Sequence, residues 1–237
     1  MQSAGGVTLD FSNKNLMLLG EFFGHKLYLT ETLLATWVVM AVLIIFAVIV
    51  RLRLRHFRGV PKGFQNVVEA LVEAMHSFTV TTMGAKLEGF GGYFFSVFAF
   101  ILLSNYSGLV GLRPPTSNLA TTAALAVSTF VMVQVAGIVC QRGYYVKSFF
   151  EPFVLFFPIN VVGELAKPIS LAFRLFGNIL GGVIIMGLVY QMLPIVLRFV
   201  LPNILHAYFD IFAGALQAFI FTVLSMTFIQ QKSVIEE

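Results

Sequence analysis

Long apolar runs alternate with short polar segments along the whole chain. A helix needs about 20 mostly apolar residues to cross a hydrocarbon core of ~30 Å. Short segments of alternating polarity, typical of a membrane β-barrel, are absent from this pattern. We therefore predict an all-α polytopic membrane protein, forming a single integral membrane domain over residues 1–237. Five runs are expected to cross, at 32–50, 93–112, 120–139, 149–192 and 201–229.

Two further segments do not fit a crossing helix. Between 64 and 78, apolar residues recur at steps of three and four, with polar residues on the opposite face. This pattern predicts an amphipathic helix that lies at the membrane interface. Residues 1–31 lack the basic start and apolar stretch of a signal peptide, so we expect them to form an outer leader.

The last two runs are longer than a perpendicular crossing requires. Pro152, Pro158 and Pro168 could break the run at 149–192 into a hairpin. Alternatively, the part from Asn160 onward forms one helix that crosses at a steep tilt. We favour the tilted helix, and the run at 201–229 leads to the same interpretation.

Composition and charge agree with a membrane protein. Hydrophobic residues make up 58% of the 237 residues, charged residues 11%, and the mean hydropathy is +0.90. The net charge of +4 does not indicate nucleic-acid binding, because the basic residues gather beside apolar runs. By the positive-inside rule, this places the amino terminus outside and the carboxyl terminus in the cytoplasm. The clearest basic cluster follows the first run, at Arg51, Arg53, Arg55, Arg58 and Lys62.

Arg174 lies deep within an apolar run and has no acidic neighbour within a helical turn. A guanidinium in hydrocarbon costs from about 3 to more than 10 kcal/mol, so such a residue indicates function. Helical spacing places Lys167, Ser170 and Asn178 on the same face as Arg174. We expect this stripe to face a partner that supplies the missing negative charge.

A second polar stripe occurs in the last run, at His206, Asp210, Gly214 and Gln217. Asp210 with His206 suits a proton relay, since both groups exchange protons and His titrates near neutral pH. A position of His206 at the membrane interface is an equally open alternative. Gln217 is expected near Arg174. Neither metal-ligand spacing nor a nucleotide-binding motif is present, so we expect no metal and no cofactor.

Two segments carry a specific resemblance. SLAFRLFGNILGG at 170–182 and ALQAFIFTVLSMTFI at 215–229 closely resemble subunit a of bacterial F-type ATP synthases, and the likeness extends more loosely over the whole chain. The resemblance implies an ion-translocating stator in the bacterial inner membrane, with two half-channels beside a ring of c subunits. It also implies a b-subunit peripheral stalk and the rest of the ATP synthase as partners, besides membrane lipid.

The resemblance also assigns roles to individual residues. Arg174 matches the family's essential arginine, which attracts each c-ring carboxylate and blocks a direct leak. Asn178 and Gln217 match polar residues near it, Glu164 an acidic position in the cytoplasmic half-channel, and Asp210 a position that is acidic or His. Some members carry a glutamate where this chain has Val183, so the outer path is expected to depend more on Asp210 and His206. The other predicted positions along the proton path are Ser170, Asn105, Ser117 and Asn118.

Two other classes of function remain open from the residues alone. A stand-alone secondary transporter could use Arg174 to bind an anionic substrate. A purely structural membrane scaffold would leave Arg174 and Asp210 without a role. The resemblance favours the stator.

Overall fold

The computed structural model describes residues 15–22, 25–54, 62–141, 143–150, 153–192, 194 and 201–233. Within these ranges, five helical segments are long and apolar enough to cross a membrane. This confirms the predicted all-α membrane fold. Part of the predicted leader (1–14) and two residues of the predicted basic cluster, Arg55 and Arg58, lie outside the described residues. The five segments are Glu31–Leu54, Ala85–Val110, Leu119–Gln141, Val154–Met192 and Leu201–Ser233.

A small antiparallel sheet precedes the first crossing helix. Strand β1 (Asn15–Phe22) pairs with β2 (His25–Thr30), and Asn15 lies opposite Thr30. This hairpin lies within the segment predicted as an outer leader, for which no strand was predicted. Helix α1 (Glu31–Leu54) begins directly after β2.

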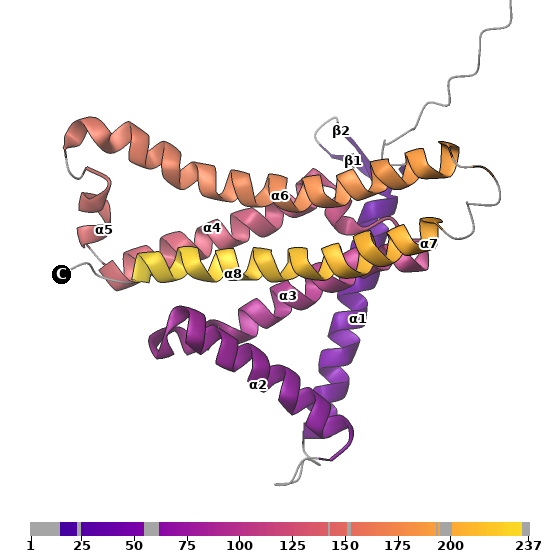
Figure 1. Cartoon of the computed structure of the whole chain (residues 1–237). Coiled ribbons are helices and arrows are strands. Elements are labelled where there is room, and N and C mark those ends of the chain that lie inside the picture. The colour runs from indigo at the N-terminus through magenta and orange to yellow at the C-terminus, as the bar shows by residue number, and fades with distance from the viewer. Residues whose placement is uncertain are drawn as a thin grey trace, which may run out of the picture.

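The predicted amphipathic helix forms as α2 (Phe64–Met83), five residues longer than expected at its carboxyl end. Large apolar side chains such as Val67, Leu71 and Val72 are exposed on it, as expected for a helix that meets lipid. In Figure 1, α1 and α2 diverge from a common end of the molecule. The Arg53 guanidinium lies 5.1 Å from the centre of the Phe64 ring and joins the two helices there.

The next two helices are joined by residues 107–118. Helix α3 (Gly91–Tyr106) is preceded by η1 (Ala85–Phe90) and followed by η2 (Ser107–Val110). Gly111, with φ of 77°, ends η2 in the left-handed region, which glycine adopts without steric cost. The turn η3 (Pro115–Ser117), which begins within the Pro114–Pro115 pair, then leads into α4 (Leu119–Gln141).

The long run at 149–192 contains one continuous helix. After α5 (Gly143–Ser148) and η4 (Val154–Phe156), α6 extends from Phe157 to Met192 with Pro168 inside it. The hairpin alternative is therefore wrong. At 1.5 Å per residue the helix is roughly 54 Å long, well beyond a ~30 Å hydrocarbon core. This length fits the predicted tilt.

The last run is also continuous, with a change of helix type near its start. Helix α7 (Leu201–His206) passes into a π-helical turn (Ala207–Ala213), which passes into α8 (Gly214–Ser233). Figure 1 shows α4 between α6 and α8, with α1 at a steep angle to both. Such π-helical turns are rare and are frequent at functional sites.

The core lies where α3, α4, α6 and α8 meet. Ile101, Ala126, Leu175 and Phe221, one from each helix, are almost fully buried in a single apolar cluster. A second cluster joins the carboxyl end of α2 to α3, α4 and α8. Different polar groups gather at the two ends of α6.

Candidate functional site

A cavity of about 750 Å³ opens at one end of the bundle, which we call the cavity end. The start of α1, the end of α3, the last turns of α6, and the end of α7 with the π-helical turn after it surround the cavity. The cavity gathers polar groups from segments that are far apart in the sequence. Its polar and charged lining residues are Glu31, Asn105, Arg113, Asn178, Tyr190, His206 and Asp210.

Three of these side chains form a hydrogen-bonded row. The Tyr190 hydroxyl lies 3.1 Å from Nε2 of His206, and Nδ1 of His206 lies 2.6 Å from Oδ2 of Asp210. The His206 and Asp210 side chains are 34% and 22% exposed, so both are partly accessible and partly covered by the protein. The predicted pairing of His206 with Asp210 is present.

Asn105 fixes the backbone beside this row. Its side-chain amide donates to the carbonyl of Gly214 at 2.9 Å and accepts from the Thr116 hydroxyl at 2.8 Å. A Cβ atom on Gly214 would lie 3.0 Å from the Cβ of Asn105, so glycine permits this close approach. Asn105 thereby ties α3, η3 and the junction between the π-helical turn and α8.

Two other residues predicted for the outer path make structural contacts. The Ser117 hydroxyl donates to the carbonyl of Pro114 at 2.7 Å. Asn118 donates to the Thr32 hydroxyl and accepts from the backbone N–H of Ala120 at the start of α4. Neither Ser117 nor Asn118 lines the cavity.

Arg174 lies midway along α6, on a face that the bundle leaves uncovered. Arg174 and Ser170 are exposed, and so is the neighbouring Phe173. Among the described residues, Arg174 has no hydrogen-bond or ion-pair partner. Asn178, one turn further along α6, is half-buried and reaches the cavity.

Gln217 lies inside the bundle. It is 6% exposed, and its Nε2 atom is buried without a hydrogen-bond partner in the described part of the chain. No hydrogen bond joins Gln217 to Arg174 among the described residues, since Gln217 is buried and Arg174 is exposed on the uncovered face. A buried, unpaired amide donor is costly and is available to a partner group or a water.

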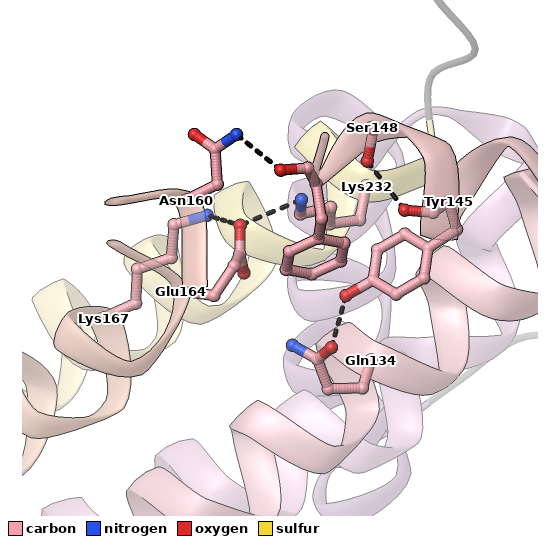
Figure 2. Close-up of polar contacts among 8 residues, drawn as sticks. Gln134, Tyr145, Ser148, Asn160, Glu164, Lys167 and Lys232 are labelled. Carbon is pink, nitrogen blue, oxygen red and sulfur yellow. Dashed lines mark hydrogen bonds and ion pairs between the residues drawn. The ribbon is translucent and has the colours of Figure 1, made fainter. Parts of the chain in front are cut away.

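The opposite end of α6 holds a cluster of ion pairs, which we call the lysine end (Figure 2). Oε1 of Glu164 lies 2.8 Å from the Lys167 ammonium and 2.9 Å from that of Lys232. Because Lys232 belongs to the last turn of α8, these bonds join the end of α8 to the start of α6. The cavity nearby is only about 10 Å³, room for about one water.

Aromatic rings close the lysine end. The Lys232 ammonium lies 5.2 Å and 5.5 Å from the centres of the Tyr145 and Phe149 rings. The Tyr145 hydroxyl donates to Oε1 of Gln134 on α4. Burial raises the pKa of the Tyr145 phenol, and the charge of Glu164 raises it further, while the hydrogen bond to Gln134 acts in the opposite direction.

Comparison with known proteins places this geometry in a family. The family model of the ATP synthase A chain matches residues 33–230. ATP synthase subunit a of Moorella thermoacetica is 36% identical over 204 residues, covering 84% of this chain and 88% of the relative. That of Trichlorobacter lovleyi is 33% identical over 224 residues, covering 91% and 94%. The chain belongs to the ATP synthase A-chain family.

Membership gives the chain its general role. It is a multi-pass membrane protein, the ion-translocating stator subunit a of an F-type ATP synthase complex. The family includes a relative from Propionigenium modestum whose name reads "ATP synthase subunit a, sodium ion specific". That protein is 33% identical over 219 residues, covering 85% of this chain and 73% of the relative.

Sequence reasoning missed three of the residues that line the cavity. Tyr190, Glu31 and Arg113 come from a helix end, a helix start and a loop. No local pattern marks Tyr190, since a tyrosine near the end of a membrane helix is ordinarily an interfacial anchor. Only the packing of α6 against α7 brings its hydroxyl to His206.

Proposed function

We propose that the uncovered face of α6 and α8 is the surface past which a ring of c subunits moves, with Arg174 as the partner of each ring carboxylate. The observation that carries this proposal is the exposed Arg174 on a membrane helix with no counter-ion among the described residues. Apolar side chains are also exposed on both helices. The exposed ones include Ile169 and Phe173 on α6 and Leu216 and Phe219 on α8.

A guanidinium on this face acts on the ring in two ways. It favours the ionised form of an arriving carboxylate, which must release its proton to one path and regain one from another. Because arginine stays protonated, Arg174 cannot carry a proton between the two paths. One charge moving through 100 mV gives about 2.3 kcal/mol, so several transfers are needed for each ATP made elsewhere in the complex.

The cavity end then serves as the outer half-channel, with Asp210, His206, Asn178 and Asn105 along it. The arrangement of the basic residues supports this orientation. Lys26 and Arg113 lie on the cavity side, whereas a larger number lie at the other ends of their helices. By the positive-inside rule those ends are cytoplasmic, which puts Glu164 at the inner half-channel and the carboxyl terminus in the cytoplasm. The basic residues on the side opposite the cavity are Arg51, Arg53, Lys62, Lys86, Lys147, Lys167 and Lys232.

The secondary transporter is the weaker alternative. An anionic substrate would need Arg174 to face an enclosed site, and Arg174 is not among the residues that line the 750 Å³ cavity. A stand-alone transporter would move its substrate after purification without any partner. The stator requires co-purification with a c-subunit ring and, through the b-subunit stalk, with the rest of the ATP synthase.

Replacement of Arg174 tests the proposal. In membrane vesicles that contain the whole complex, Arg174→Ala should abolish ATP synthesis driven by an ion gradient, while the amount of assembled complex stays near normal. The matched control is Arg53→Ala, which removes an exposed arginine at the end of α1 and should leave synthesis within about twofold of normal, since isolated surface contacts contribute little. Normal synthesis in the Arg174 variant would contradict the assignment.

A further inference from the structure

In the row of Tyr190, His206 and Asp210, the chemistry of the atoms decides which group donates and which accepts each hydrogen bond. An ionised carboxylate only accepts hydrogen bonds, so with Asp210 ionised the proton between His206 and Asp210 lies on Nδ1. In the neutral imidazole, Nε2 is then the acceptor. The Tyr190 hydroxyl, 3.1 Å away, therefore donates to it.

Resting on the proposed role of the cavity as the outer half-channel, we propose that Tyr190 is a positioning residue of the proton path. Its hydroxyl holds the His206 ring in the orientation in which Nε2 faces Tyr190 and Nδ1 faces Asp210, and the Asp210 carboxylate then keeps the proton on Nδ1. The row thus makes the His206–Asp210 pair a relay for protons.

The proton transfer balances in three steps. A proton from cavity water binds Nε2 of His206, and the Tyr190 oxygen turns from donor to acceptor. The Nδ1 proton then passes to Oδ2 of Asp210, which leaves a neutral acid and an imidazole protonated on Nε2. After Asp210 gives its proton onward, His206 returns its Nε2 proton to cavity water and takes another proton from cavity water on Nδ1, so the net transfer is one proton from the cavity through Asp210.

One observation favours positioning over simple packing. The Tyr190 side chain is 45% exposed, so it does not fill the core. It meets His206 through the hydroxyl bond and through a ring contact with centroids 6.2 Å apart, and a phenylalanine would lose only the hydroxyl bond. Val183 also lines the cavity and is apolar, so it offers no acid at that point of α6. The other charged residues that line the cavity, Glu31 and Arg113, come from α1 and the α3–α4 turn.

The test compares two Tyr→Phe variants in the intact ATP synthase. Tyr190→Phe removes only the hydroxyl that contacts His206. Tyr208→Phe is the matched control, since that side chain is 54% exposed and makes ring contacts with Phe209 and Phe212. Proton flux into vesicles is measured together with the ¹⁵N NMR signals of the histidine side chains, which distinguish the two tautomers. A His206→Gln variant identifies the signals of His206.

The wild type should show His206 protonated on Nδ1, and Tyr190→Phe should give mixed tautomers with a flux about fivefold lower, the effect of one lost hydrogen bond. Tyr208→Phe should change neither. An Nε2-protonated wild type, or unchanged tautomer and flux in Tyr190→Phe, would overturn the inference. Asp210→Asn distinguishes the role of Tyr190 from the proposed outer half-channel. If Asp210→Asn stops the flux and Tyr190→Phe does not alter it, only the role of Tyr190 is wrong. If Asp210→Asn leaves the flux normal, the proposed outer half-channel is wrong.

Discussion

The two ends of α6 are built from opposite kinds of polar contact. At the cavity end, a row of hydrogen bonds lies beside a space of about 750 Å³. At the lysine end, Glu164 holds two ammonium groups, and the nearby space is about 10 Å³. The difference teaches that one helix can present an open path for water at one end and a closed charged joint at the other.

The physical reason lies in what covers each end. At the lysine end, Tyr145 and Phe149 cover the ammonium of Lys232, which excludes water and strengthens the attraction between the charges. At the cavity end, the π-helical turn and the short α7 leave a gap beside the last turns of α6. We therefore expect loss of the ion pairs at the lysine end to lower stability most, and changes at the cavity end to lower it less.

The largest expected loss of stability follows Glu164→Gln. It would leave two half-buried ammonium groups without their carboxylate, which costs about 3 kcal/mol of unfolding free energy. Denaturant titration of the purified protein in detergent measures the loss. Glu69→Gln on the exposed face of α2 is the control and should change stability by less than about 0.5 kcal/mol. Equal stability of the two variants would show that the ion pairs do not hold the lysine end.

A smaller loss is expected for Asn105→Ala at the cavity end. The change leaves the Thr116 hydroxyl and the Gly214 carbonyl without their buried partner, at a cost of about 2 kcal/mol. Because Asn105 fixes the backbone next to Asp210, proton flux should fall too. Ser96→Ala removes an exposed hydroxyl that bonds only within α3, and it should alter neither quantity. A stability loss with normal flux would separate Asn105 from the proton path.

The smallest effect is expected for Gly137→Ala at the lysine end. A Cβ atom there would lie 2.6 Å from a carbon of the Tyr145 ring, so the ring must shift away from Lys232. Overpacking costs about 1–3 kcal/mol, and the better helix propensity of alanine offsets up to about 1 kcal/mol of that. Gly163→Ala on α6 has no atom within 4 Å and should be neutral or stabilising. A thermal unfolding comparison of the two variants tests whether the ring is packed as tightly as described.

The helices and Arg174 could be predicted because their signals are local. Apolar runs long enough to cross a membrane are visible residue by residue, and all five predicted crossings form. The continuity of α6 through Pro168 was harder to predict, because proline removes one backbone donor whether the helix breaks or only bends. The hairpin β1–β2 escaped prediction, since two short strands in a mixed-polarity leader give no strong period.

The sequence by itself determined the membrane class, the five crossings, the unpaired arginine and the pairing of His206 with Asp210. All of these follow from composition or from spacing within one helix. Only the tertiary structure decided that Tyr190 meets His206, that Lys232 meets Glu164, and that Gln217 is buried while Arg174 is exposed. These contacts join different helices, and their geometry depends on how the helices rotate and pack against one another, which no local pattern encodes.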